Sequence, residues 1–283
     1  MSSCGSDGNA ATISSPLRLA YGPASLQFGD LYVPKGSGPH PVVILIHGGF
    51  WRAAYTLALM QGLAGDLVEK SVAAWNIEYR RLGDPGGGWP GTLQDVAHAA
   101  DYLAMLAPTY ALDLTRIIAV GHSAGGQLAL WLAARSRLPK KSPLTVSDTP
   151  LPLAGVVSLA GASDLNLVWH LNLGQGAAAE LLGDSPDKVP ERYAIASPAT
   201  LLPLNIPQVL LHGKRDNLVP LTVSQQYAQK AVRAGDRVRL IELPGADHFA
   251  LIDPTSAAWA IAIKEIQQLH NELDLAAKNE PQS

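Results

Sequence analysis

The chain of 283 residues is poor in cysteine and in charge, with one cysteine, Cys4, and 16% charged residues. A single cysteine cannot form a disulfide within the chain, so cysteine usage leaves the redox state of the compartment unmarked. A formal net charge of −3 gives no electrostatic reason to expect a nucleic acid or an anionic membrane as a partner. The sequence also lacks an apolar run of the ~18 residues that a membrane span needs. These absences favour a soluble protein, with the cytoplasm as its default location.

The first residues, MSSCGSDGNAATISS, lack the positively charged segment and the apolar segment of a signal peptide. We therefore expect a disordered polar tail over residues 1–15. The alternative is that Cys4 carries the lipid of a trimmed lipoprotein signal, although the apolar segment that would precede it is missing. A second polar tail is expected over residues 274–283.

Apolar sequence, by contrast, is abundant: hydrophobic residues make up 47% of the chain, enough for a sizeable core. From about residue 40 onward, short apolar runs alternate with segments whose apolar residues recur at helical spacing. Strands that are buried on both faces of a parallel sheet have the composition of these runs. The runs expected to form strands are 41–47, 71–79, 116–122, 153–161, 207–213 and 237–245. The segments expected to form helices are 55–70, 92–106, 124–135, 221–234 and 255–273.

This alternation predicts an α/β fold with a mostly parallel sheet of about eight strands and helices on both faces. Two earlier segments, 18–21 and 26–33, are separated by turn residues and are expected to form an antiparallel hairpin at one edge. We place the whole as a single domain at 16–273. Residues 163–203 break the rhythm, because they lack a clear strand and carry several glycines and prolines. An insertion of this length is expected to be a functional lid.

One hydroxyl stands among glycines and alanines at AVGHSAGG, residues 119–126. The segment 121–125 satisfies G-x-S-x-G between a predicted buried strand and a predicted helix, which is the setting that this motif requires. The chain has to reverse so sharply there that the backbone of Ser123 is strained, and glycine on either side removes Cβ atoms that would clash. A plain small-residue turn is the alternative, but the setting favours Ser123 as a nucleophile.

A serine hydroxyl needs a base to take its proton and a carboxylate to orient that base. In sheets that carry G-x-S-x-G, both partners follow the serine in the chain, each just beyond a later strand. PQVLLHGKRDNLVP places Asp216 after one strand, and RVRLIELPGADHFAL places His248 after the next. We predict His248 as the base and Asp216 as the orienting acid, with Asp253 as the alternative carboxylate. His122 and His212 lie at strand ends, where a packed or hydrogen-bonded role is expected.

Acyl transfer also requires donors for the oxyanion that forms when a carbonyl is attacked. The segment HGGFW, residues 47–51, follows a predicted strand, and its backbone N–H groups can face the serine. The expected donors are the N–H groups of Ala124 and of Gly49 or Phe50. No cluster of His, Cys and Asp residues has the spacing of metal ligands, so we expect neither a metal nor an organic cofactor.

The lining of the pocket is harder to predict. Trp51, Trp169 and Phe249, together with Phe50, lie beside the candidate catalytic elements or in the lid. They could form an apolar pocket for the acyl or alcohol group, although Trp51 and Phe249 fit the core equally well. Asp164 follows a predicted strand and is expected to cap a helix of the insertion, with ligand contact as the alternative.

These motifs together resemble the α/β-hydrolase superfamily over about residues 16–273. The resemblance rests on HGGFW at 47–51, GHSAGG at 121–126, HGKRDNLVP at 212–220 and GADHF at 245–249. It is strongest to the carboxylesterase and hormone-sensitive-lipase-like branch, which also contains kynurenine formamidases. HGGFW fits the H-G-G-x-W form of the formamidases.

One segment departs from that branch, whose chains often read YRLAPE followed by a proline and an aspartate. The corresponding segment here, 79–96, keeps Tyr79, Arg80, Pro90 and Asp95 but lacks the acidic Pro-Glu pair. The departure weakens assignment to one subfamily and leaves the superfamily unaffected. The insertion at 163–203 corresponds to the lid region of the family.

The residues and the resemblance predict a serine hydrolase that cleaves small, short-acyl carboxylic esters through an acyl-enzyme. The alternatives are hydrolysis of N-formylkynurenine or another small amide and, more remotely, a ligand-binding member of the fold without turnover. The expected partner is therefore a small-molecule ester or amide, with neither nucleic acid nor membrane. The sequence leaves open the acyl length, the leaving group, the oligomeric state and the pathway.

Overall fold

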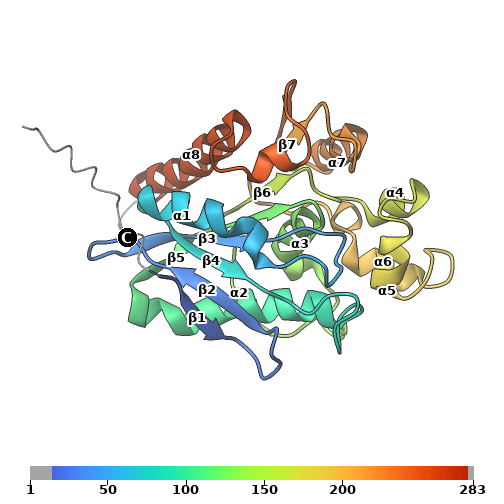
Figure 1. Ribbon diagram of the computed structural model, residues 1–283, viewed down its shortest axis with the longest axis horizontal. Helices are drawn as coiled ribbons and strands as arrows, with labels where there is room; N and C mark the ends of the chain where they lie inside the picture. Colours follow the sequence, from blue (N-terminus) through green and yellow to red (C-terminus); the bar gives the residue numbers. More distant parts are fainter. Residues whose placement is uncertain (1–14, 280–283) are drawn as a thin grey trace, which may run out of the picture.

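An eight-stranded sheet forms the centre of the molecule, in the order β1-β2-β4-β3-β5-β6-β7-β8 (Figure 1). The computed structural model describes residues 15–279, so Cys4 and the predicted tail at 1–15, apart from residue 15, lie outside the described residues. Strand β2 pairs antiparallel with β1 and with β4, and the remaining neighbours are parallel. The predicted mostly parallel α/β sheet with an antiparallel hairpin at one edge is confirmed.

The strands match the predicted runs closely. They are β1 (Leu17–Ala20), β2 (Phe28–Tyr32), β3 (His40–Ile46), β4 (Ala73–Ile77), β5 (Leu112–His122), β6 (Gly155–Leu159), β7 (Gln208–Gly213) and β8 (Val238–Leu243). Strand β5 starts earlier than the apolar run that predicted it. Leu112 and Asp113 already pair with the start of β3, and a register shift between Pro41 and Val42 then restores the pairing of the apolar run.

The long helices also lie where apolar spacing predicted them. They are α1 (Gln61–Glu69), preceded by a 3-10 turn at Leu57–Met60, α2 (Gly91–Tyr110), α3 (Ala124–Ala133), α7 (Leu221–Arg233) and α8 (Ala257–Asn279). Helix α8 extends into the segment 274–283 that was expected to be a polar tail. No helix within the described residues combines the length and the apolar character that a membrane span needs.

Two apolar cores lie on opposite faces of the sheet because successive side chains of a strand alternate in direction. Val42, Ile44 and Ile46 of β3 belong to the core that α2, α3 and α7 cover. Val43 and Leu45 belong to the core that α1 and α8 cover. The layered arrangement is visible in Figure 1, where α1 and α8 lie above the sheet and α2 below it. A sheet buried on both faces leaves the strand ends as the places where polar chemistry can gather.

The insertion at 163–203 contains no strand, as expected. Its helices are α4 (Leu165–His170), α5 (Ala177–Leu182) and α6 (Pro190–Ala196), followed by a 3-10 turn at Pro198–Thr200. They gather at the right-hand end of the molecule in Figure 1. The side chain of Asp164 accepts hydrogen bonds from the N–H groups of Asn166 and Leu167, which confirms the predicted cap of α4.

Candidate active site

Ser123 lies in the sharp turn between β5 and α3. Its backbone has φ 57° and ψ −119°, a conformation that side-chain-bearing residues rarely adopt and that costs energy. A Cβ atom on Gly121 would lie 1.9 Å from the carbonyl oxygen of Gly125, and one on Gly125 would lie 2.1 Å from that of Ile46. Only glycine fits at these two positions, so the motif holds the serine in its strained conformation by close backbone packing on both sides.

Asp216 and His248 meet across the ends of β7 and β8. The Nδ1 atom of His248 lies 2.6 Å from Oδ2 of Asp216. Because an ionised carboxylate only accepts hydrogen bonds, Nδ1 is the donor, and Nε2 of the neutral ring carries a lone pair. An imidazole held in this tautomer is ready to take up a proton at Nε2.

The carboxylate of Asp216 is buried and well provided with donors. The N–H groups of Leu218 and Val219 both donate to its Oδ1 at 2.9 Å, and Nε2 of His212 lies 3.3 Å from Oδ2. Burial acts to raise the pKa of Asp216, but hydrogen bonds with His212 and His248 and the N–H of Val219 hold the pKa well below its usual range. The carboxylate therefore stays ionised at any pH near neutrality.

Ser123 and His248 line the same narrow cavity, of about 30 Å³, at the carboxyl ends of the strands. Gly49, Phe50 and His122 also line it. Its other lining residues are apolar or aromatic: Tyr55, Leu59, Leu218 and Phe249. Of these, Tyr55, Leu218 and Phe249 are exposed, with 51% of Phe249 accessible. The polar side chains of His122, Ser123 and His248 are thus buried, whereas most of the apolar and aromatic lining residues are exposed.

The predicted oxyanion donors lie around this cavity. Gly49 has φ 110°, and a Cβ there would lie within 2.5 Å of the Tyr55 ring, so the position needs glycine. Phe50, with φ 50°, continues the turn. Ala124 is the first residue of α3, and the first N–H groups of a helix have no acceptor within it. Ser123 does not compete for this role, since its own N–H donates to the carbonyl of Leu159.

The three residues predicted to contact substrate lie in different environments, and one of them lines the cavity. Phe249 lines the cavity. Trp51 is fully buried in the core and its indole N–H donates to Gln127 at 3.0 Å. Trp169 packs against the core and its ring contacts His170. Among the described residues that line the cavity, neither tryptophan appears.

Two other features bear on the predicted chemistry. Asp253, the alternative carboxylate, accepts hydrogen bonds from Thr255 rather than from His248. Within residues 15–279, no group of three or more His, Cys, Asp or Glu side chains is arranged to hold a metal ion.

His122 has a closer relation to the base than its place at a strand end predicted. Its Nε2 donates to the backbone carbonyl of His248 at 2.9 Å, and the two imidazole rings lie 4.4 Å apart. Burial, the largest cause, and the neighbouring His248 lower the pKa of His122 to about 3, so the ring is neutral. The residue before the serine therefore ties β5 to the loop that carries His248. Only its position beside Ser123 hinted at this contact in the sequence.

A second buried pair was not predicted at all. His47, from HGGFW, lies 2.9 Å from Glu78 through its Nε2 atom, and both side chains are almost fully buried. Glu78 directly precedes the Tyr79-Arg80 pair noted in the sequence. The sequence offered one partial signal, an acidic residue directly after an apolar run, but it did not show that this run would become the neighbour of the strand before the glycine loop.

The family can be assigned at this point. A family model described as BD-FAE matches residues 29–231, a span that includes the glycine loop and Ser123. The chain belongs to the BD-FAE family of α/β hydrolases. The predicted superfamily is therefore confirmed.

This BD-FAE protein is similar to several curated enzymes. It is 27% identical to a probable isoprenylcysteine α-carbonyl methylesterase of Arabidopsis thaliana over 81% of the chain and 50% of the relative. It is 30% identical to kynurenine formamidase avaC of Aspergillus versicolor over 69% of the chain and 76% of the relative. The chain spans about half the length of the plant methylesterases that it matches.

Solved structures share the fold of this BD-FAE protein. A truncated carbohydrate esterase from gut microbiota superposes with a TM-score of 0.78 at 22% identity, covering 92% of this chain and 98% of that one. Esterase B from Lactobacillus rhamnosis superposes with a TM-score of 0.78 at 20% identity, covering 93% and 88%. At this level of identity the likeness establishes the α/β-hydrolase architecture alone.

Proposed function

We propose that this protein is a serine hydrolase that cleaves short-acyl carboxylic esters, with Ser123 as nucleophile, His248 as base and Asp216 as orienting acid. The observation that carries the proposal is the 2.6 Å contact between His248 Nδ1 and Asp216 Oδ2, together with the cavity that His248 shares with Ser123. The contact leaves the Nε2 lone pair of His248 for the serine hydroxyl. Few structural roles require a serine in a strained turn that shares a cavity with an imidazole hydrogen-bonded to a buried carboxylate.

The chemistry follows from this arrangement. His248 Nε2 takes the proton of Ser123 as Oγ forms a bond to the ester carbonyl carbon. The tetrahedral intermediate collapses, the leaving oxygen takes that proton from Nε2, and the acyl group stays on Oγ. Water then attacks the acyl-enzyme and gives a proton to Nε2. The second tetrahedral intermediate collapses as Oγ of Ser123 takes that proton back from Nε2, which releases the carboxylic acid and free Ser123. Asp216 remains ionised throughout, as its lowered pKa requires, and stabilises the imidazolium that forms twice in the cycle.

In both tetrahedral intermediates the carbonyl oxygen becomes an oxyanion. We assign its donors to the N–H groups of Ala124 and of Gly49 or Phe50. Ala124 adds the positive end of the α3 dipole. Donors fixed in place before the reaction stabilise the charge without reorganising, which is typically a large part of the rate enhancement in acyl transfer.

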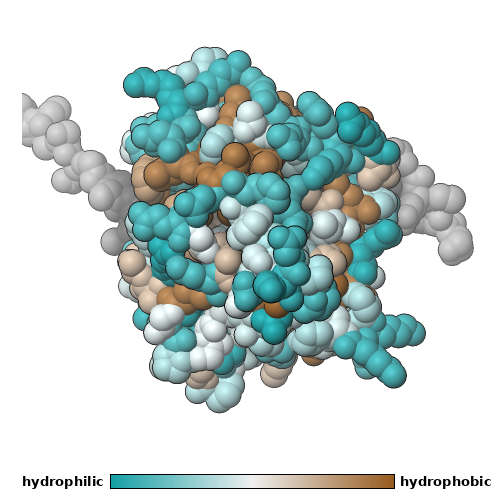
Figure 2. All heavy atoms as spheres, turned by 90° about the vertical axis from the view of Figure 1, so that its right-hand side faces the viewer, coloured by the Kyte–Doolittle hydropathy of each residue, from teal (hydrophilic) through white to brown (hydrophobic). Residues whose placement is uncertain are grey.

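Short acyl groups are favoured by the size of the site. The cavity at Ser123 is about 30 Å³, and the lid contains short helices broken by glycine rather than one long amphipathic helix. Figure 2 faces this end of the molecule, and its apolar side chains form separate patches among polar ones. A lipase lid needs a broad apolar face to bind an oil–water interface. We therefore expect a preference for two to about six acyl carbons, since the ~0.8 kcal/mol gained per buried methylene ends where the pocket does.

Hydrolysis of N-formylkynurenine, or of another small formamide, is the second candidate. It is favoured by the 30% identity to kynurenine formamidase avaC and by the HGGFW segment. A formamide has its small group on the acyl side of the scissile bond, whereas the methyl ester in the name of the plant relatives has it on the alcohol side. The small volume of the cavity at Ser123 and the exposed apolar residues that line it suit a small acyl group and a larger apolar leaving group.

A hydrolysis panel tests these assignments. Rates are measured for p-nitrophenyl esters from acetate to palmitate, for N-formylkynurenine, and for the methyl ester of a bulky acid. We expect kcat/KM to be highest at two to about six acyl carbons, with no jump in rate as a substrate passes its micellar threshold. A maximum at twelve carbons or more, or such a jump, would overturn the short-acyl assignment, and N-formylkynurenine outperforming every ester would replace it by the formamidase.

A further inference from the structure

His47, the first residue of the glycine loop that follows β3, contacts the backbone of that loop through its side chain. Nδ1 of His47 lies 2.8 Å from the carbonyl oxygen of Gly48, the next residue in the chain. A carbonyl oxygen only accepts, so Nδ1 carries a proton and donates it. The bond turns the side chain of His47 back onto the backbone of the loop.

The hydrogen bond to the Gly48 carbonyl also fixes the direction of the Gly49 N–H. The Gly48 carbonyl and the Gly49 N–H belong to the same planar trans peptide unit and point in opposite directions. Holding the Gly48 oxygen on the imidazole therefore points the Gly49 N–H away from it. Gly49 lines the cavity that contains Ser123, and its N–H is one of the assigned oxyanion donors. Glycine has more backbone freedom than other residues, so the hydrogen bond to His47 adds a constraint to the close packing of Gly48 and Gly49 against their neighbours.

His47 is itself held by three contacts with the two residues that directly follow β4, Glu78 and Tyr79. Its Nε2 meets Oε1 of Glu78 at 2.9 Å. The ring of Tyr79 stacks on the imidazole with centroids 4.4 Å apart, and the Tyr79 hydroxyl donates to the His47 carbonyl at 2.9 Å. Glu78 is fixed in turn by the N–H of Leu57 and by the guanidinium of Arg81. The imidazole has no freedom to turn without breaking one of these contacts.

We propose that His47, held by Glu78 and Tyr79, is a positioning residue that orients the Gly48–Gly49 peptide so that its N–H serves the oxyanion. The inference rests on the proposed serine-hydrolase function. It gives a role to Glu78 and Tyr79, the two residues after β4, which hold the loop that follows the neighbouring strand β3. The buried pair is thus part of the machinery that acts in the tetrahedral intermediate, one step removed from the substrate.

Two amide substitutions separate the two ring nitrogens of His47. In His47→Asn the amide nitrogen replaces Nδ1 and can still donate to Gly48. In His47→Gln the amide nitrogen replaces Nε2 and keeps the contact with Glu78, but the donor to Gly48 is lost. Loss of one oxyanion donor typically lowers kcat by ~10²- to 10³-fold. We expect His47→Gln to lose about 10² in kcat with little change in KM, and His47→Asn to stay within about tenfold of wild type.

The same pair is compared for binding of an aryl trifluoromethyl ketone, whose adduct with a serine carries an oxyanion. His47→Gln should weaken this binding in parallel with kcat, and His47→Asn should not. The matched control is His40→Gln, because His40 is also buried and begins β3, the strand whose opposite end leads into His47. This control should leave kcat and ketone affinity unchanged. Equal kcat in the Asn and Gln variants, with both folded, would overturn the proposal.

If the two amide variants do not fold, Tyr79→Phe decides the question, since it keeps the stacked ring and removes only the hydroxyl that holds the His47 carbonyl. It should lower kcat and ketone affinity together at constant KM. A change in melting temperature alone would reject the proposal.

Labelling of wild-type Ser123 by a fluorophosphonate distinguishes failure of the proposed function from failure of the role of His47. Absence of labelling rejects the proposed function itself, whereas labelling with equal kcat in all variants rejects only the role of His47.

Discussion

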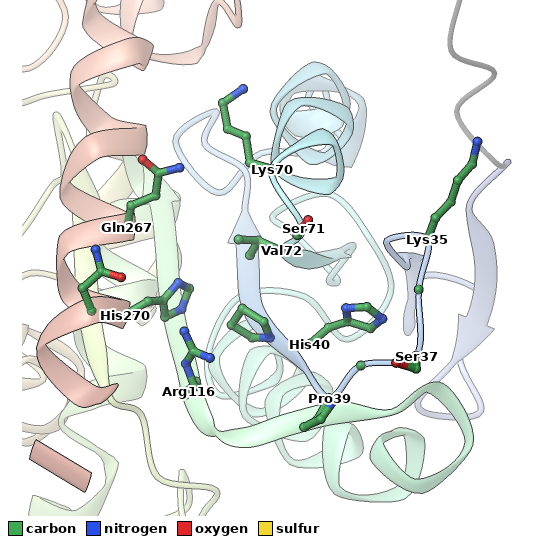
Figure 3. A pocket seen from close by; sticks show the side chains of 14 residues that line it. Lys35, Ser37, Pro39, His40, Lys70, Ser71, Val72, Arg116, Gln267 and His270 are labelled. Carbon is green, nitrogen blue, oxygen red and sulfur yellow. The ribbon is translucent and has the colours of Figure 1, made fainter. Parts of the chain in front are cut away.

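The two ends of the parallel strands offer a direct comparison, because one sheet carries a hollow at each. At the amino ends lies a pocket of about 490 Å³, lined by loops and by residues such as His40, Arg116 and His270. Figure 3 shows how these side chains come from β3, β5 and α8. At the carboxyl ends lies the cavity of about 30 Å³ that contains Ser123 and His248. The larger hollow is thus not the one that Ser123 and His248 line, so size alone does not identify the candidate site.

Backbone strain also distinguishes the two ends. At the amino ends, Ala111 has φ 50° and ψ 51°, an ordinary left-handed residue that closes α2. At the carboxyl ends, Ser123 has φ 57° and ψ −119°, and it begins a helix rather than closing one. The left-handed conformation of Ala111 ends a helix. The strained conformation of Ser123 exposes its side chain at the top of the turn. In open α/β sheets ligands bind outside the carboxyl ends of the strands, in agreement with this contrast.

Removal of the hydroxyl should give the largest effect at the carboxyl ends. We expect Ser123→Ala to fold normally and to lose about 10⁶ in kcat, because members of a triad act as a unit. Ester hydrolysis by the purified variant measures the loss. A fluorophosphonate should label the wild type at Ser123, and labelling at any other serine would reassign the nucleophile.

The orienting acid should come next. Asp216→Asn leaves the shape of the site intact, but an amide can stabilise the wrong tautomer of His248, and the loss in kcat should be about 10⁴. KM should change little, since Asp216 lies behind the imidazole. Asp253→Asn is the control, because its carboxylate bonds to Thr255 instead. If Asp253→Asn were the damaging change and Asp216→Asn were harmless, the carboxylates would have to be exchanged.

The contrast between the ends also explains what the sequence could and could not predict. The turn at Ser123 was predictable because its constraints are local: Gly121 and Gly125 are required by backbone contacts within a few residues or with the adjacent strand. The order of Asp216 and His248 followed from the alternation of strands and helices, and the structure brings the two into contact. Their roles stay predictions.

Contacts between distant loops were not predictable. His122 reaches the backbone of His248 across 126 positions, and His47 reaches Glu78 across 31. No sequence motif or periodicity marks pairs at these separations, because each contact depends on which strands become neighbours in the sheet. The insertion illustrates the same limit. Apart from the helix that Asp164 was expected to cap, its helical content was not assigned from the sequence, since short helices such as α5 and α6 owe their stability to packing rather than to length.

A smaller effect is expected in the pH dependence of stability. In the folded protein His122 remains neutral down to its pKa of about 3, whereas in the unfolded chain it titrates near ~6.5. Between these values the unfolded state binds more protons, so stability is lost as pH falls, by up to ~1.4 kcal/mol per pH unit for one site. His122→Gln keeps an N–H donor for the His248 carbonyl and removes this titration. Urea unfolding between pH 7 and pH 4 should show a shallower loss for the variant, and an unchanged slope would contradict the burial of a neutral imidazole.

The smallest effect is predicted at the amino ends, and it tests whether the larger pocket takes any part in hydrolysis. Ser37 lines that pocket and is exposed, so Ser37→Trp puts an indole into it without disturbing the core. The two hollows are separated by the length of β3, seven residues, or roughly 20 Å at ~3.3 Å per residue. Removing the charge of Lys35 by Lys35→Ala tests the electrostatic route, and at this distance the field of an exposed charge is screened, since the Debye length is ~8 Å at physiological salt. Both variants should keep kcat/KM for a short-chain ester within about 1.5-fold of wild type, as no direct contact or unscreened field joins the pocket to Ser123. A tenfold loss in either variant would mean that the two ends of the sheet are coupled. The larger pocket would then take part in hydrolysis, contrary to the comparison drawn above.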